Sequence, residues 1–179
     1  MGTIFVDNIK QQSSQGSGTI TIGASGETVS FASGVTGTNY PAFECNLNGQ
    51  TFNIANSTLT KVIMTNEILD TNSAYDTSTG RFTPQVAGTY FVYGQIAFDS
   101  TSDFDNIEIM LRKNESTTFG DALDRNEFYT SLNAHGVVSL NGSSDHITLH
   151  AKQVSGGTVG LLDSGNGSTC TFGAFRIGT

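Results

Sequence analysis

The amino-acid sequence predicts an all-β protein, and three observations favour that fold class. Glycine, serine, threonine and asparagine are abundant, whereas the 179 residues include only two prolines. Several short segments alternate apolar and polar residues with the period of two that is typical of half-buried strands, and turn-forming residues separate them. No long segment shows the apolar spacing of an amphipathic helix. We therefore expect many short strands joined by tight turns.

The length of the chain is typical of one domain with an appendage. We expect an N-terminal arm over residues 1–38 and a head over residues 39–179. A head of about 140 residues buries roughly two thirds of the surface of its unfolded chain. It therefore needs neither a disulfide nor a metal ion in order to fold.

In the arm, residues 19–22 and 27–31 alternate with period two on either side of a turn at residues 23–26. This pattern predicts a β-hairpin, and a single hairpin is only marginally stable in water. The arm is therefore expected to add its strands to copies of itself or to another protein. The predicted anchor residues are the apolar side chains Ile4, Phe5, Val6, Ile20, Ile22, Val29 and Phe31.

In the head, the longest apolar run covers residues 89–98 and includes four aromatic residues, so it is the predicted central strand. Tyr90 on one side of this run, with Phe91 and Tyr93 on the other, indicates a strand that is buried on both faces. A long strand over residues 127–140 is either continuous or interrupted at His135-Gly136. The other predicted strands cover residues 41–47, 51–54, 59–64, 81–83, 106–113, 146–154, 158–162 and 169–177.

The stretch from Met64 to Gly94 carries acidic, aromatic and glycine residues at a fixed spacing. These motif residues are Asp70, Tyr75, Phe82, Gly88 and Tyr90. At this spacing the chain resembles the globular head of complement C1q and of tumour-necrosis-factor-like proteins, from about residue 39 to residue 177. It departs from the family pattern at Met64 and Val92, where the family has phenylalanine, and at Gly94, where the family has an aromatic residue.

The resemblance implies a ten-strand jelly-roll sandwich that assembles as a homotrimer. Phe172 and Phe175, on opposite faces of the last strand, would then face the core and a neighbouring copy of the chain. The resemblance does not imply one function, because secreted animal proteins, bacterial surface proteins and virion proteins all use this head.

The arm carries a second resemblance. Phe5 to Lys10 reads FVDNIK and Gly18 to Val29 reads GTITIGASGETV, and both are similar to the N-terminal segments of structural proteins of tailed phages. Together, the two resemblances imply a virion protein that is made in the cytoplasm of the host cell and joins the particle through its arm.

Charge and hydropathy argue against two classes of partner. Charged residues make up 13% of the chain and the formal net charge is -8, whereas nucleic-acid binding requires lysine and arginine contacts to phosphate. No apolar run approaches the ~18 residues that span a membrane. Residues 1–10 lack the basic start and apolar core of a signal peptide. We expect neither nucleic-acid binding nor membrane insertion.

The two cysteines, Cys45 and Cys170, lie in the first and last predicted strands of the head. In the jelly roll that the resemblance implies, those strands are neighbours, so a disulfide is geometrically conceivable. A protein made and kept in the cytoplasm retains reduced thiols, and we expect two buried free cysteines.

The predicted receptor loop contains Asp99, Asp103, Phe104 and Asp105, and residues 114–125 form a second predicted loop. Loops on a rigid scaffold frequently carry recognition. The three aspartates are also candidate calcium ligands. Their order does not match the helix–loop–helix calcium pattern, so a solvated acidic loop is the simpler interpretation and no cofactor is expected.

Two histidines, His146 and His150, are candidate metal ligands by residue type. His146 and His150 lie four residues apart, about 13 Å along one face of a strand, which is too far for one ion. We expect both to face solvent. The sequence contains no nucleophile elbow, zinc-protease motif or phosphate loop, so an enzyme is not expected.

The predicted function is therefore that of a non-enzymatic phage virion structural protein, of the tail-fibre, head-fibre or decoration type. Its arm docks on the particle, and its trimeric head projects outward and binds a glycan or protein of the host surface. One alternative is a capsid or tail cement protein without a receptor. Another is a soluble complement-type ligand-binding protein of a cell.

Overall fold

A computed structural model describes residues 40–99, 103–125, 131–162 and 169–178. The chain divides into two units, residues 1–38 and residues 39–179. The predicted hairpin and the anchor residues between Ile4 and Phe31 lie outside the described residues. The fold below is that of the second unit, the head.

The described part of the head consists of antiparallel strands and contains no helix, so the predicted all-β class is confirmed. One sheet has five strands, in the order β10 (Ser131–Leu140), β7 (Gly88–Ala97), β13 (Thr171–Gly178), β1 (Ala42–Asn46) and β4 (Asn66–Asp70). The other sheet has six strands. Five of them follow the order β5 (Tyr75–Asp76), β6 (Arg81–Phe82), β11 (Ile147–Val154), β8 (Asn106–Lys113) and β9 (Thr117–Asp124). The sixth, β3 (Thr60–Lys61), pairs with β11 outside this order. A small third sheet pairs β2 (Asn53–Ile54) with β12 (Val159–Gly160).

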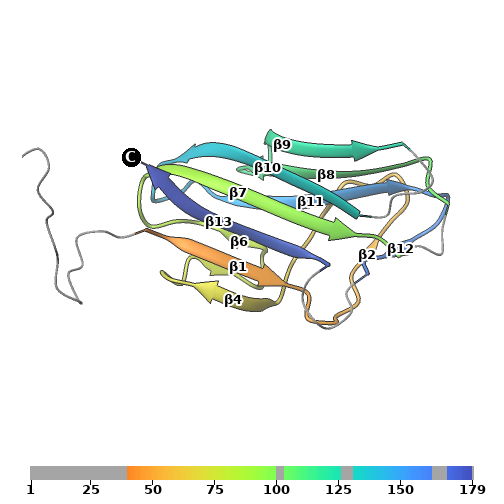
Figure 1. Cartoon of the computed structure of the whole chain (residues 1–179), viewed down its shortest axis with the longest axis horizontal. Coiled ribbons are helices and arrows are strands. Elements are labelled where there is room, and N and C mark those ends of the chain that lie inside the picture. The colour runs from red at the N-terminus through yellow and green to blue at the C-terminus, as the bar shows by residue number, and fades with distance from the viewer. Residues whose placement is uncertain (1–39, 100–102, 126–130, 163–168, 179) are drawn as a thin grey trace, which may run out of the picture. The chain divides into compact units, whose positions relative to one another are not determined.

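The two larger sheets form the layers of a sandwich, with β7 and β13 in one layer and β8 and β11 in the other (Figure 1). The core lies between them, because alternate side chains of each strand point to the same face. In β8 the inward residues are Ile107, Ile109 and Leu111, and all three are buried. A Cβ on Gly94 of β7 would lie 2.7 Å from Leu149 Cδ1 of β11, so that leucine fills the space which the glycine leaves.

One side of the sandwich closes where β9 of one sheet meets β10 of the other. A Cβ on Gly120 would lie 2.6 Å from the His135 carbonyl oxygen, and a Cβ on Gly136 would lie 2.7 Å from the Phe119 carbonyl oxygen. Any side chain at either glycine would therefore push the two backbones apart.

The head begins and ends at neighbouring points. Ala42, at the start of β1, is paired with Phe175 near the end of β13. Just outside this pair, the Arg176 N–H donates a hydrogen bond to the Pro41 carbonyl oxygen at 3.0 Å.

The structure corrects the sequence prediction at two strands. Residues 117–124, predicted as part of a loop, form β9, and residues 66–70, where no strand was predicted, form β4. In β9 the buried position opposite β10 is Gly120, so the expected apolar side chain is missing from the pattern. In β4 the register against β1 shifts, and the adjacent residues Ile68 and Leu69 are both exposed, which breaks the period of two.

Other strands differ from the prediction in length. Of residues 59–64, only Thr60–Lys61 forms a strand. β10 is continuous through His135 and Gly136, which pair with Tyr93 and Val92 of β7. The described residues contain thirteen strands, where the resemblance implies ten, and five of the thirteen are only two residues long.

Candidate functional site

Asp70 and Tyr75, two of the motif residues, hold the turn between β4 and β5. The Asp70 Oδ2 atom accepts hydrogen bonds from the Ala74 and Tyr75 N–H groups, both at 2.7 Å, and Oδ1 accepts one from the Asn72 N–H at 3.2 Å. The Tyr75 hydroxyl donates to the Met64 carbonyl oxygen at 3.0 Å and accepts from the Met64 N–H at 3.2 Å. These two side chains act on backbone groups inside the head.

The remaining motif residues lie in and beside an aromatic cluster of the core. Phe82 stacks on Phe43 with ring centroids 4.3 Å apart, and Tyr90 meets Phe82 edge-on at 6.0 Å. The Tyr90 hydroxyl donates to the Val86 carbonyl oxygen at 2.6 Å. A Cβ on Gly88 would lie 2.5 Å from the Gly178 carbonyl oxygen, so only glycine fits there. In this structure the motif supports the fold and contributes no open binding site.

The three positions that depart from the family pattern also face the core. Met64 and Val92 are fully buried, as phenylalanine would be. At Gly94 the side chains of Leu149 and Leu111 lie within 3.4 Å of where a Cβ would stand. The space that Gly94 leaves is thus filled by leucines of the opposite sheet.

An exposed surface on the outside of the five-stranded sheet is rich in apolar and aromatic side chains. We call it the apolar face, and it consists of Phe91, Tyr93, His135, Val137 and Phe175. Strand pairing brings these residues together, because Phe91 of β7 lies opposite both Val137 of β10 and Phe175 of β13. Val137 is 55% exposed and Phe175 is 44% exposed. The apolar face is thus partly uncovered in the single chain.

Ring contacts organise the apolar face around Phe91. Its ring centroid lies 5.4 Å from that of Phe175, 6.1 Å from that of His135 and 6.5 Å from that of Tyr93. The sequence predicts the aromatic residues of this surface, since both faces of β7 are aromatic and Phe175 lies on the opposite face from Phe172 in the last predicted strand. His135 and Val137 join the surface through the register of β10.

Tyr93 is held flat at the edge of the apolar face. Its hydroxyl donates to Glu44 Oε2 at 2.6 Å, and a Cβ on Gly173 would collide with its ring. Burial and the nearby Glu44 carboxylate raise the pKa of the Tyr93 phenol above its usual range. The phenol therefore remains a hydrogen-bond donor at neutral pH.

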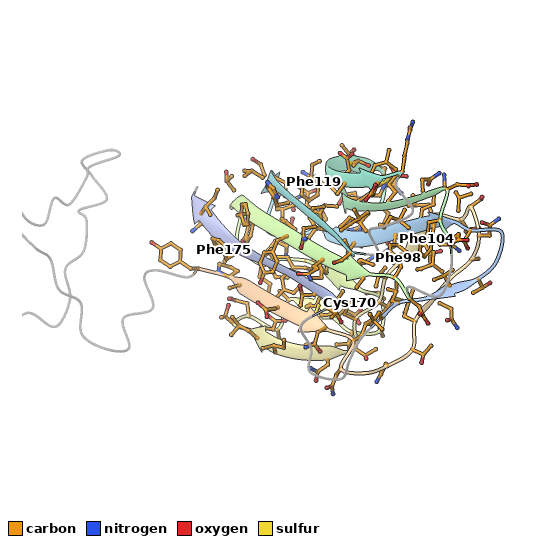
Figure 2. All side chains as sticks on the ribbon, turned by 45° about the vertical axis from the view of Figure 1, so that its right-hand side comes forward. Phe98, Phe104, Phe119, Cys170 and Phe175 are labelled. Carbon is orange, nitrogen blue, oxygen red and sulfur yellow. The ribbon has the colours of Figure 1, made fainter. Side chains whose placement is uncertain are left out.

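The structure corrects the predicted receptor loop at Phe104. Phe104 is 3% exposed and lies edge-on against Phe98 with ring centroids 5.7 Å apart, so it belongs to the core (Figure 2). Asp103 and Asp105 are exposed, and Asp99 is partly buried. Residues 100–102 lie outside the described residues. Within the described ranges, no three histidine, cysteine, aspartate or glutamate side chains gather as a metal site.

Both cysteines are buried, and no disulfide joins them. The Cys45 thiol donates to the Phe172 carbonyl oxygen at 3.3 Å, and the Cys170 sulfur accepts a hydrogen bond from the Ala97 N–H at 3.4 Å. Burial raises the pKa of the Cys45 thiol, so this group is not an activated nucleophile.

His150 departs from the expectation that it faces solvent, because it is only 6% exposed. Its Nε2 atom lies 3.0 Å from Thr148 Oγ1. Loss of hydration, with a further contribution from the Arg112 charge, lowers the pKa of His150 to about 4. The imidazole is therefore neutral at pH 7.

Comparison with known proteins identifies the fold. A crystal structure of murine APRIL at pH 8.5 matches with a TM-score of 0.57 and 15% identity, over 78% of this chain and 100% of that chain. The globular domain of zebrafish complement 1qA matches with a TM-score of 0.53 and 19% identity, over 76% of this chain and 97% of that chain. No curated protein matches the sequence. In the described residues, no helix is long and apolar enough to cross a membrane.

The sequence itself matches the family model of the C1q domain over residues 42–177, which is most of the chain. C1q and tumour-necrosis-factor-like domains form homotrimers and are generally non-enzymatic binding modules. Both the fold and the sequence comparison agree with the resemblance that the motif indicates, and the chain belongs to the C1q domain family.

Proposed function

We propose that the head assembles as a homotrimer through the apolar face. The observation that supports this most is the contiguous set of Phe91, Tyr93, Val137 and Phe175 on the outside of a sheet whose other side is already covered by the core. Large exposed apolar patches on soluble proteins mark interaction surfaces. Three equivalent copies around one axis would cover this face in each chain.

Sedimentation of the full chain at micromolar concentration tests the trimer. We expect a particle of three chains, whereas one chain has a mass of 18.9 kDa. Phe175→Asp places a charge on the apolar face and should produce monomers. Leu123→Asp is the matched control, because Leu123 is 45% exposed on β9 of the other sheet, and it should remain trimeric. A monomeric wild type, or two variants that behave alike, contradicts the proposal.

The trimer is proposed to serve as a non-enzymatic structural protein of a phage virion, with the arm docked on the particle and the head projecting outward. The support for the virion is the similarity of residues 5–10 and 18–29 to phage structural proteins. The support for a binding role of the head is its family, whose domains are generally binding modules.

A truncated chain starting at Asn39 tests whether the arm, and not the head, attaches the protein to the particle. This head has its own core, so it should still trimerise but should no longer join particles assembled in its presence. If it attaches as well as the full chain, the anchor lies in the head.

Adsorption of the purified head to host cells separates the adhesive role from the alternatives. Saturable binding to cells supports a fibre or adhesive decoration protein. Attachment to particles without binding to cells would instead identify a cement protein. Failure of the full chain to co-purify with virions would favour the ligand-binding protein of a cell.

A further inference from the structure

The outer side of the six-stranded sheet carries a cluster of lysine, arginine and histidine side chains. We call it the basic patch, and it consists of Lys61, Arg81, Arg112, His146 and His150 around the carboxylate of Glu115. Strand pairing gathers it, because Lys61 of β3 lies opposite His150 of β11, and the neighbouring Thr148 lies opposite Arg112 of β8. The basic patch thus contains three of the chain's eight lysines and arginines, in a chain whose net charge is -8. Two of them, Lys61 and Arg81, contact the Glu115 carboxylate.

Glu115 is the group that the basic patch holds in this structure. Its Oε1 atom lies 2.7 Å from an Arg81 guanidinium nitrogen, 3.0 Å from Lys61 Nζ and 3.9 Å from His146 Nε2. Hydrogen bonds from Arg81 and then Lys61 lower the pKa of Glu115 to about 2. The two cationic neighbours, Arg81 and Lys61, converge on a single oxygen, and charge-assisted hydrogen bonds of this kind are the way in which proteins hold a carboxylate.

The backbone that presents Glu115 is in a conformation that glutamate rarely adopts. Asn114 and Glu115 have φ angles of 51° and 57°, and the Ser116 N–H donates to the Lys113 carbonyl oxygen at 3.1 Å. This is a hairpin turn of the type that strongly prefers glycine at the second central position. A glutamate here strains the turn, and backbone strain of this kind concentrates at functional sites.

The basic patch also contains unused hydrogen-bonding capacity. Arg112 Nε, His146 Nε2 and His150 Nδ1 are buried and have no hydrogen-bond partner. Buried polar atoms are nearly always satisfied, so three orphaned nitrogens in one cluster require an explanation. Arg112 Nε is always a donor, so an additional oxygen acceptor would satisfy it, and an imidazole nitrogen is satisfied in the same way in the tautomer that carries its proton there.

Nearby carboxylates do not meet this need, because they have other partners. Asp76 lies opposite Arg81 in the strand register, but its oxygens accept hydrogen bonds from Ser78 and Thr79. Asp145 binds the Lys113 ammonium at 2.7 Å.

We propose that the basic patch is a binding site for a carboxylate or sulfate group of another molecule, and that the Glu115 carboxylate occupies the site until such a group displaces it. The incoming oxygens accept hydrogen bonds from Arg112, whose guanidinium already contacts the Ser116 carbonyl oxygen next to Glu115, and from His146 Nε2 beside the Glu115 carboxylate. Lys61 and Arg81 supply the charge. The site belongs to one head and lies on the sheet opposite the apolar face. It does not depend on the proposed trimer or on the virion.

The test is a titration of the full chain with three probes: inorganic sulfate, galacturonate and, as the uncharged counterpart, galactose. Imidazole resonances of His146 and His150 are followed by NMR, and affinities are measured by calorimetry. We expect saturable binding of sulfate and of galacturonate, competition between the two, and no binding of galactose. Binding of sulfate alone would identify a site for a free inorganic anion and overturn its assignment to carboxylates.

Two variants sharpen the test. Glu115→Gly removes the internal carboxylate and also relieves the strained turn, so it should fold well and bind both anions about tenfold more tightly, which corresponds to about 1.4 kcal/mol. Arg112→Gln should weaken binding by about tenfold. Arg125→Gln is the control, since it removes one positive charge from an exposed position outside the basic patch, and it should change affinity less than twofold.

Two results would overturn the proposal. One is the absence of saturable shifts at His146 and His150 in both the wild type and Glu115→Gly. The other is equal weakening by Arg112→Gln and Arg125→Gln, which would mean that the anions respond only to the overall charge of the chain.

Discussion

The Tyr75 hydroxyl shows how one atom of this head connects distant segments. It is buried and both donates to and accepts from the backbone of Met64, eleven residues earlier in the chain. Burial contributes most to raising the pKa of this phenol above its usual range. Because water does not reach the site, the two backbone groups of Met64 have no replacement partner if the hydroxyl is removed.

Tyr75→Phe should therefore destabilise the head by about 1–3 kcal/mol, the cost of leaving buried polar groups unpaired. Urea unfolding followed by circular dichroism measures the change. Tyr40→Phe, at an exposed tyrosine, is the control and should change stability by less than about 0.5 kcal/mol. Equal effects of the two substitutions would show that the Met64 contacts contribute nothing.

His150 should make the stability of the head depend on pH. Its pKa in the folded chain is about 4, below the ordinary value of 6.5, so the unfolded chain binds the proton first as the pH falls. This contribution to stability is complete above pH 6.5 and is lost as the pH falls from about 6.5 to about 4. His150→Gln should remove this part of the pH dependence.

The comparison requires urea midpoints of the wild type and of His150→Gln between pH 4 and pH 8. Carboxylates also titrate near the acidic end, so the difference between the two proteins is the informative quantity. Parallel curves would mean that His150 has the same proton affinity in the folded and unfolded chains.

At the scale of elements, the meeting of β9 and β10 depends on two glycines. Gly120 and Gly136 permit a backbone approach between strands of different sheets that no side chain allows. The strands on either side of this contact, β8 and β7, belong to the core of the two layers. A substitution that separates β9 from β10 should therefore destabilise both sheets.

Gly120→Ala should destabilise the head by about 1–3 kcal/mol, because its Cβ would stand 2.6 Å from the His135 carbonyl oxygen. Thermal unfolding measures the loss. Gly157→Ala is the control, since a Cβ at Gly157 meets no atom within 4 Å. A Gly120→Ala head as stable as the control would mean that β9 and β10 separate at little cost.

The elements also show what the sequence can predict. β8 was predicted at its observed bounds, residues 106–113, because it buries Ile107, Ile109 and Leu111 on one side and exposes polar residues on the other. β9 was missed because its buried position is a glycine. β4 was missed because its register shift breaks the alternation.

The same reasoning applies to the sites. The aromatic part of the apolar face could be predicted from β7 and from the last strand, whereas the places of His135 and Val137 beside it follow from the register of β10. The basic patch combines residues of β3, β6, β8 and β11 with a hairpin turn, and no short stretch of sequence brings these together. Phe104 was assigned to a receptor loop because its aspartate neighbours are polar, although its own side chain fills the core.

At the scale of the whole head, the reactivity of the two buried thiols depends on unfolding of the sandwich. Cys45 is held by β13 and Cys170 by the end of β7, so neither is reached without separating central strands. Ellman's reagent should react with neither thiol in the native protein and with both in denaturant. Their labelling rates under native conditions should be equal and should match global unfolding. Fast reaction of one thiol, or fewer than two thiols in denaturant, would contradict this prediction.

The position of the two ends of the head has a consequence for how such a protein changes over time. The start of β1 and the end of β13 are paired, so the chain enters and leaves the head at the same end of two neighbouring strands of one sheet. A unit with adjacent ends can be inserted into a surface loop of another protein without stretching that loop. It can also be exchanged between carriers as a single gene segment, because the carrier has to provide only one attachment point. A head built in this way is free to move from one carrier protein to another as a single unit, with its own core intact.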